Sequence, residues 1–138
     1  MPIVIGLLLA VAVAAYAKFT RFDQDRSFYS TVLVIVASYY VLFAVMGDST
    51  HALVQETIAG LIFSVAAVFG AVRLPVLLGI GLVAHGLFDL IHHAIIPNPG
   101  VPSWWPAFCM SFDVVLGLWV IGLYRSRASK EPALTVGR

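Results

Sequence analysis

The chain has 138 residues, of which 61% are hydrophobic and 11% charged, and its formal net charge is +1. A soluble domain of this length is nearer half apolar and a quarter charged, so the composition excludes an ordinary soluble protein and indicates an integral membrane protein of one domain. The sequence has no basic helix face and no basic cluster with interleaved aromatic residues, so nucleic-acid binding is not expected.

Five apolar stretches have about the 20 residues that a membrane-spanning helix needs. In chain order they cover residues 2–17, 29–47, 52–72, 74–96 and 106–124. We therefore expect an all-α fold, an integral membrane bundle of five transmembrane helices that forms a single domain over residues 1–125. The polar segment 126–138 is expected to be a flexible cytoplasmic tail.

The first stretch has a rival interpretation as a cleaved signal peptide, because Ala15, Tyr16 and Ala17 form an A-x-A sequence of the kind that signal peptidases cut. A signal peptide also needs a basic segment ahead of its apolar core, and Met1 to Tyr16 has no charged side chain. We therefore favour a first stretch that remains in place as a transmembrane helix.

The basic residues predict the orientation of the bundle. With five spans, all of them fall on one side, and they are Lys18, Arg21, Arg26, Arg73, Arg125, Arg127, Lys130 and Arg138. Loops 47–51 and 97–105, on the other side, contain no Lys or Arg. Because short cytoplasmic loops carry an excess of Lys and Arg, we expect the N-terminus outside and the C-terminus in the cytoplasm.

The segment 97–106 has the sequence PNPGVPSWWP, and its prolines predict a stiff, extended and non-helical connection. Its two tryptophans are typical of a membrane interface. The segment is either a rigid connector with an aromatic anchor or a lid over the polar residues beneath it, and the sequence favours the connector.

The fourth stretch contains the sequence HGLFDLIHH, which predicts a polar face on one helix. His85, Asp89 and His92 are spaced by four and three residues, so they share one side of the helix, and His93 lies at its edge. These residues lie in the outer half of the predicted span. An ionisable side chain within the membrane is costly, so it normally marks a functional site.

Two other stretches place a carboxylate at a similar depth. At a rise of about 1.5 Å per residue, Asp89 and Asp113 both lie about 10 Å below the outer end, and Glu56 lies about 6 Å below it. No Lys or Arg is near enough in the sequence to neutralise them. We therefore expect an outward-facing intramembrane pocket of His, Asp and Glu residues.

A divalent metal ion would neutralise these carboxylates, and histidine with carboxylate is a ligand set of zinc, iron or manganese. The candidate metal ligands are His85, Asp89, His92, Asp113 and Glu56. Glu56 and His92 are also the candidate catalytic acid and base. The candidates for alternative ligands, or for groups that orient the ligands, are His51, His93, Cys109, Tyr39 and Tyr40. Cys109 is the only cysteine, which excludes an intrachain disulfide, and a buried free cysteine is more often a packing residue than a ligand.

Three functions are compatible with this pattern. The favoured one is a metal-binding membrane protein, with a membrane-embedded metalloenzyme that acts on a lipid or another apolar molecule as its more specific form. The second is an oligomeric proton-coupled or metal-ion transporter, which the nearly apolar inner halves of the last three stretches disfavour. The third is a non-catalytic subunit whose His and Asp residues only hold the helices together. The expected partners are the lipid bilayer, an apolar small molecule and further copies of the chain.

The sequences HGLFDLIHH and PSWWPAFCMSFD resemble a pair of motifs in a family of small bacterial integral membrane proteins of unknown function. That family's pattern is similar to H-G-x-[WF]-D-x-x-H-H, followed by an aromatic-Pro-x-Phe-Cys sequence and an Asp. The matching residues here are His85, Asp89, His92, His93, Trp105, Pro106, Phe108, Cys109 and Asp113. The resemblance covers the last two stretches. It implies only that these residues belong together in one site, and it gives no activity. The expected location is the bacterial plasma membrane, with the pocket on the outer side.

Overall fold

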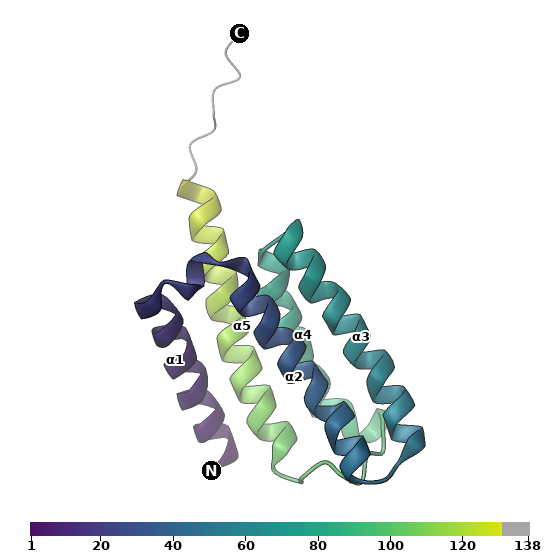
Figure 1. The fold of residues 1–138 in the computed structure, drawn as a ribbon. Coiled ribbons are helices and arrows are strands. Elements are labelled where there is room, and N and C mark those ends of the chain that lie inside the picture. Colours follow the sequence, from purple (N-terminus) through teal and green to yellow (C-terminus); the bar gives the residue numbers. More distant parts are fainter. Residues whose placement is uncertain (131–138) are drawn as a thin grey trace.

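A computed structural model describes residues 1–130 and contains five α-helices in that range (Figure 1). They are α1 (Pro2–Thr20), α2 (Arg26–Met46), α3 (Thr50–Val72), α4 (Val76–Ile95) and α5 (Trp105–Lys130), and a short 3-10 helix, η1 (Phe22–Gln24), lies between α1 and α2. All five are long and apolar enough to cross a membrane. The predicted all-α architecture with five candidate spans is therefore confirmed.

The helices run alternately up and down between two ends of the bundle (Figure 1). One end, here called the basic end, carries η1, the α3–α4 turn and the last turns of α5. The other, the loop end, carries the start of α1, the α2–α3 turn and the loop 96–104. Among residues 1–130, every Lys and Arg belongs to the basic end, namely Lys18, Arg21, Arg26, Arg73, Arg125, Arg127 and Lys130. The predicted separation of charge is present, and which end faces the cytoplasm stays a prediction.

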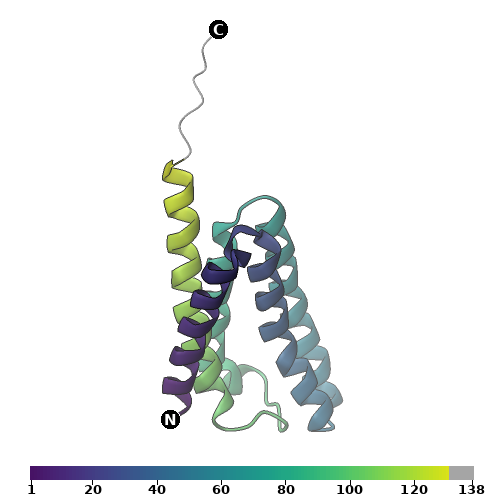
Figure 2. The ribbon, with the colours of Figure 1, turned by 60° about the vertical axis from the view of Figure 1, so that its left-hand side comes forward.

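The most extensive helix contacts join α4 to α5, α2 to α3 and α1 to α5. In Figure 2, α1 and α5 form one side of the bundle, and α2 with α3 forms the other. The loop that leads from α4 to α5 crosses between these two sides at the loop end, where Gly100 contacts the backbone of Phe43. The loop thus lies at the loop end, between the two sides of the bundle.

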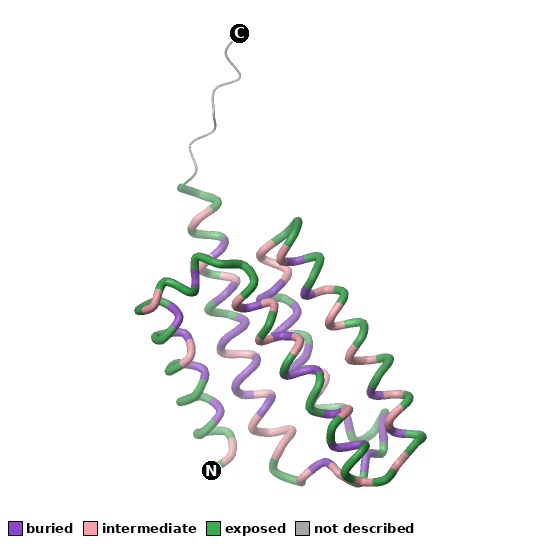
Figure 3. The backbone as a smooth tube through the Cα atoms, viewed as in Figure 1, coloured by how far each residue is buried: buried purple, intermediate pink, exposed green. Residues whose placement is uncertain are grey.

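The outer faces of the helices are largely apolar, and Figure 3 shows the exposed positions along the outward sides of the helices. On α3, for example, Ile62 is 65% exposed and Val65 is 68% exposed. A water-soluble protein rarely exposes contiguous apolar surface of this extent, whereas a membrane-spanning helix presents it to lipid tails. The burial pattern therefore agrees with five helices that sit in a bilayer.

Side chains cap two of the helices. The Asp25 carboxylate accepts a 2.9 Å hydrogen bond from the backbone N–H of Ser27 and begins α2, while the Ser49 hydroxyl accepts one from Ala52 and begins α3. The bond from Ser27 lowers the pKa of Asp25, because it stabilises the ionised carboxylate. These caps place the helix starts next to the short turns that connect the spans.

Helix α5 is longer than the predicted fifth span. It continues to Lys130, so residues 126–130, which were expected to start a flexible tail, are helical. The rest of that expectation concerns residues 131–138 and lies outside the described residues.

Two glycines bring α4 and α5 into backbone contact. A Cβ atom added to Gly79 would lie 2.6 Å from the carbonyl oxygen of Gly117, and one added to Gly117 would lie 2.7 Å from that of Gly79. Real Cβ atoms do not approach backbone so closely, so any side chain here would separate the helices. This close packing lets short polar side chains on α4 reach those on α5 near the loop end.

Candidate functional site

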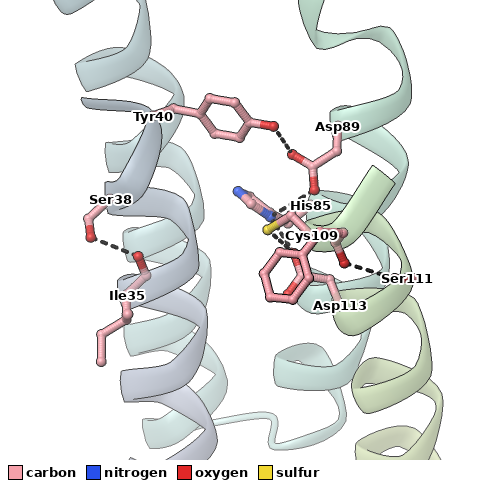
Figure 4. A network of polar contacts seen from close by, with 9 residues as sticks. Ile35, Ser38, Tyr40, His85, Asp89, Cys109, Ser111 and Asp113 are labelled. Carbon is pink, nitrogen blue, oxygen red and sulfur yellow. Dashed lines mark hydrogen bonds and ion pairs between the residues drawn. The ribbon is translucent and has the colours of Figure 1, made fainter. Parts of the chain in front are cut away.

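Four side chains from two helices form a buried cluster, here called the four-residue group. Helix α4 contributes His85 and Asp89, and α5 contributes Cys109 and Asp113 (Figure 4). Each residue offers one atom of a kind that binds metals, and these atoms all lie within 4.8 Å of one another. All four residues are at most 2% exposed. The arrangement is therefore one that could hold a metal ion.

The group is connected by short hydrogen bonds. The Nδ1 atom of His85 lies 2.6 Å from Oδ2 of Asp113 and 3.8 Å from Oδ2 of Asp89. The Cys109 thiol donates to the same Asp113 oxygen at 3.5 Å. From α2, the Tyr40 hydroxyl donates a 2.6 Å hydrogen bond to Oδ1 of Asp89 (Figure 4). Each carboxylate is thus held in place by one donor from a neighbouring helix.

One oxygen of each carboxylate remains without a partner. Within residues 1–130, Oδ2 of Asp89 and Oδ1 of Asp113 are buried and accept no hydrogen bond. Buried polar atoms are normally paired, and a buried negative charge needs a positive one nearby. Among the same residues, no Lys or Arg forms an ion pair with either carboxylate, and His85 can supply at most one positive charge. A bound cation would therefore compensate the charge of these two buried carboxylates.

A second polar cluster, here called the Glu56 group, lies beside the first. Its members are Glu56 of α3, His92 of α4 and Asn98 of the following loop, and all three are buried. The Nε2 atom of His92 lies 2.7 Å from Oε1 of Glu56, and the Asn98 amide donates to the same oxygen at 2.8 Å. The amide also donates to the backbone carbonyl of Tyr40 at 3.1 Å. The Asn98 bonds fasten the loop to α2 and α3, and the bond between His92 and Glu56 joins α3 to α4.

Tyr40 joins the two groups. Its ring stacks on that of His92, with the centroids 4.0 Å apart and an interplanar angle of 24°. Its hydroxyl donates to Asp89 of the four-residue group. A continuous series of polar contacts therefore runs from the loop through Tyr40 to the interface between α4 and α5.

The predicted site residues fall into two sets in space. His85, Asp89 and Asp113 come together as expected, but Glu56 and His92 pair with each other beside that group. Their predicted roles as metal ligands and as acid and base stay predictions. The structure gives them a direct mutual hydrogen bond, which the sequence did not indicate.

The residues predicted as alternative ligands or as orienting groups also fall into two sets, some at the site and some away from it. Cys109, for which packing was the favoured role, lies inside the four-residue group, and Tyr40 is buried against it. Tyr39 is 36% exposed and packs on Trp105. The remaining two candidates, His51 and His93, are exposed residues of α3 and α4. The ring of His93 lies 5.7 Å from that of His92, so it borders the Glu56 group.

Sequence reasoning missed Asn98. It is the only amide side chain of the proline-rich loop, and it is 4% exposed. Its position between Pro97 and Pro99 could have indicated a fixed contact for its side chain. Prolines on both sides restrict the backbone at Asn98 and so limit the directions that its side chain can take. Its partners could not be identified from the sequence, since they depend on how the loop crosses the bundle.

An apolar groove reaches the four-residue group from the side. It has a volume of about 670 Å³ and lies between α1, α2 and α5. Its walls include Ile5 and Leu9 of α1, Val36 of α2 and Phe112 of α5. Cys109 also lines it, so this residue contacts both the groove and Asp113.

Comparisons with models of protein families, with characterised proteins and with solved structures find no similar protein. The family resemblance of the last two helices therefore stays a prediction, and the function has to be inferred from the chemistry of the site.

Proposed function

We propose that the chain is an integral membrane protein that binds one metal ion at His85, Asp89, Cys109 and Asp113 and acts on a lipid or another apolar molecule. One observation carries the proposal. An imidazole, a thiol and two carboxylates, all buried, meet between α4 and α5 with one oxygen of each carboxylate unpaired. Such a cluster is costly in an apolar bundle unless a cation compensates its charge.

The charges and donor types suit a transition metal. Two carboxylates and a thiolate carry three negative charges, of which a divalent ion compensates two, and a neutral imidazole adds no charge. Imidazole and thiolate ligands favour zinc or iron, whereas manganese prefers sites built of oxygen ligands. The thiol of Cys109 therefore narrows the expected metals to zinc and iron.

Metal binding would require the ligand atoms to shift by about 1 Å, some toward and some away from one another. Two nitrogen or oxygen ligand atoms on a tetrahedral zinc ion, each about 2.0–2.2 Å from it, are about 3.3–3.6 Å apart. The hydrogen-bonded atoms of His85 and Asp113 are 2.6 Å apart, and the whole group lies within 4.8 Å. Binding would replace the proton shared by His85 and Asp113 and would move these two side chains apart by about 1 Å, by the same ligand distances.

The surrounding residues have distinct expected roles. A bound metal ion would supply Lewis-acid or redox chemistry. Tyr40 orients Asp89, and the pair of His92 and Glu56 is available for proton transfer. The apolar groove would admit a hydrocarbon chain to Cys109 and so to the edge of the site. We infer from this arrangement that the substrate is apolar over much of its length.

A structural role for the polar network is the second candidate. It is favoured by the hydrogen bonds that His85, Asp113, Tyr40 and Asp89 already make with one another. Hydrogen bonds between membrane helices stabilise a bundle modestly, by about 0.6–2 kcal/mol each. Transport is less well supported, because α4 and α5 have no His, Asp, Glu, Lys or Arg between the four-residue group and the basic end.

Cobalt substitution separates metal binding from a structural network. The full chain in detergent would be titrated with Co²⁺ while its absorption spectrum is recorded. Metal binding predicts ligand-field bands together with a thiolate-to-cobalt charge-transfer band. Cys109→Ser should remove the charge-transfer band and keep ligand-field bands. The absence of cobalt bands from a folded wild-type protein would leave the structural network as the better account.

A further inference from the structure

A second groove lies at the basic end, far along the bundle from the four-residue group. It has a volume of about 710 Å³ and is bordered by the start of α2, the start of α4 and the end of α5. Three of its lining residues are arginines, namely Arg26, Arg125 and Arg127, and none is acidic. The groove is therefore positively charged in a chain whose membrane-facing surface is otherwise mostly apolar.

The three arginines are not equivalent. Arg127 forms an ion pair with Asp23, with Nη2 and Oδ2 2.7 Å apart, and also donates to the Asp23 backbone carbonyl. Arg26 and Arg125 are exposed, and within residues 1–130 neither forms an ion pair. Two positive charges at the groove are thus free to pair with an anion, while Asp23 holds the third in place.

A buried hydroxyl provides an independent observation. Tyr124 lines the same groove and is 9% exposed, and its hydroxyl is buried without a hydrogen-bond partner among the described residues. A buried tyrosine hydroxyl is normally paired. Tyr124 therefore offers a donor that nothing in residues 1–130 uses.

Apart from Gln24, the remaining lining residues are apolar, and two of them, Ile80 and Ile121, lie deeper in the expected membrane. Ile121 precedes Arg125 by four residues, which places it about 6 Å further along α5 toward the middle of the bundle. Ile80 lies at a comparable distance from the start of α4. Positive charge at the rim and aliphatic walls below it match an anionic lipid, whose phosphate lies at the interface and whose acyl chains extend inward.

We propose that this groove is a binding site for an anionic glycerophospholipid. Arg26 and Arg125 pair with its phosphate, the Tyr124 hydroxyl donates to an ester or phosphate oxygen, and an acyl chain lies along Ile80 and Ile121. The proposal does not depend on the metal site, which lies toward the other end of the bundle.

Native mass spectrometry of the full chain in detergent tests the proposal. Dioleoylphosphatidylglycerol, dioleoylphosphatidylcholine and inorganic phosphate would each be titrated, and the bound fractions compared. Phosphatidylglycerol should bind at one saturable site, and phosphatidylcholine at least tenfold more weakly. Inorganic phosphate should not displace the lipid, because the acyl chain contributes to binding. Equal binding of the two lipids would show ordinary boundary lipid and overturn the proposal, and displacement by phosphate would show a simple anion site and overturn it too.

Matched double variants localise the site. R26Q/R125Q should weaken phosphatidylglycerol binding about thirtyfold, at roughly fivefold for each basic residue near an anionic surface. R21Q/R73Q removes the same charge from the same end, at residues that do not line the groove, and should change binding less than twofold. Thermal unfolding of both variants confirms that each is folded. An equal loss in both would indicate diffuse attraction by the basic end and contradict a site.

Tyr124→Phe tests the hydroxyl by itself. The ring is kept and only the donor is removed, so binding should weaken about fivefold, the effect of one hydrogen bond. Thermal stability should be unchanged, because the hydroxyl has no partner within the described residues. Unchanged lipid binding would remove Tyr124 from the site.

Discussion

The Nδ1 atom of His85 and the Oδ2 atom of Asp113 lie 2.6 Å apart across the interface of α4 and α5. The sequence separates them by 28 positions. They meet because Gly79 and Gly117 let the two helix backbones touch nearer the basic end. A packing feature without any polar chemistry therefore sets the geometry of the candidate metal site.

We expect Gly117→Ala to destabilise the protein and disturb the four-residue group. The added Cβ would overlap the Gly79 carbonyl, and such overpacking typically costs about 1–3 kcal/mol. Thermal unfolding in detergent would show a lower midpoint. Gly122→Ala is the matched control, because nothing lies within 4 Å of its Cβ and alanine favours a helix. If both variants unfold at the wild-type temperature, the close contact between Gly79 and Gly117 does not restrict the residue at position 117.

Tyr40→Phe should weaken metal binding while it preserves the fold. The ring would still stack on His92, but Asp89 would lose the only hydrogen-bond donor that residues 1–130 supply from outside the four-residue group. Loss of a partner that orients a ligand usually lowers metal affinity about 10–100-fold. Competition with a chromophoric chelator measures the change. Tyr39→Phe should have no effect, since within residues 1–130 the Tyr39 hydroxyl forms no hydrogen bond with the four-residue group and its ring packs on Phe43 and Trp105. A similar loss in that variant would argue against an orienting role for Tyr40.

Asn98→Ala should release the loop 96–104 without removing the metal site. The amide bonds to Glu56 and to the Tyr40 backbone would be lost, and each unpaired buried partner costs about 1–3 kcal/mol. Hydrogen exchange of the loop amides should accelerate while the metal content stays at the wild-type value. A protected loop in this variant would show that its path is fixed by other contacts.

Leu9→Trp should block the apolar groove. Leu9 lines the groove on α1, and a tryptophan would occupy part of its 670 Å³ volume. We expect less apolar lipid to co-purify with the variant, as measured by lipid mass spectrometry, with unchanged metal content. Val65→Trp, at a lipid-facing position of α3, is the control. Equal lipid retention by the two variants would contradict a role of the groove in substrate binding.

The helices and half of the site were predictable from the sequence. Each span has to satisfy its own backbone hydrogen bonds in lipid, so length and hydropathy are sufficient to identify it. Helical spacing likewise places His85 and Asp89 on one face of α4 and Cys109 and Asp113 on one face of α5. The structure shows that these two faces meet.

The other features of the site could not be predicted from the sequence, because they depend on tertiary packing. Depth in the membrane follows from residue counting, but the rotation of each helix about its axis does not. Glu56 was expected among the metal ligands because its depth is similar, yet α3 directs it to His92 and Asn98. The path of the loop, which decides the partners of Asn98, is likewise set by contacts such as that of Gly100 with Phe43.

Elemental analysis of gently solubilised protein, prepared without chelators, tests the central proposal most directly. The wild-type chain should contain about one zinc or iron ion per chain. Asp113→Asn should contain none, because the isosteric amide removes one carboxylate from the four-residue group. Glu56→Gln, altered at an equally buried carboxylate of the neighbouring group, should retain the metal. Folded wild-type protein without metal, or equal metal in the wild type and Asp113→Asn, would contradict the proposed site.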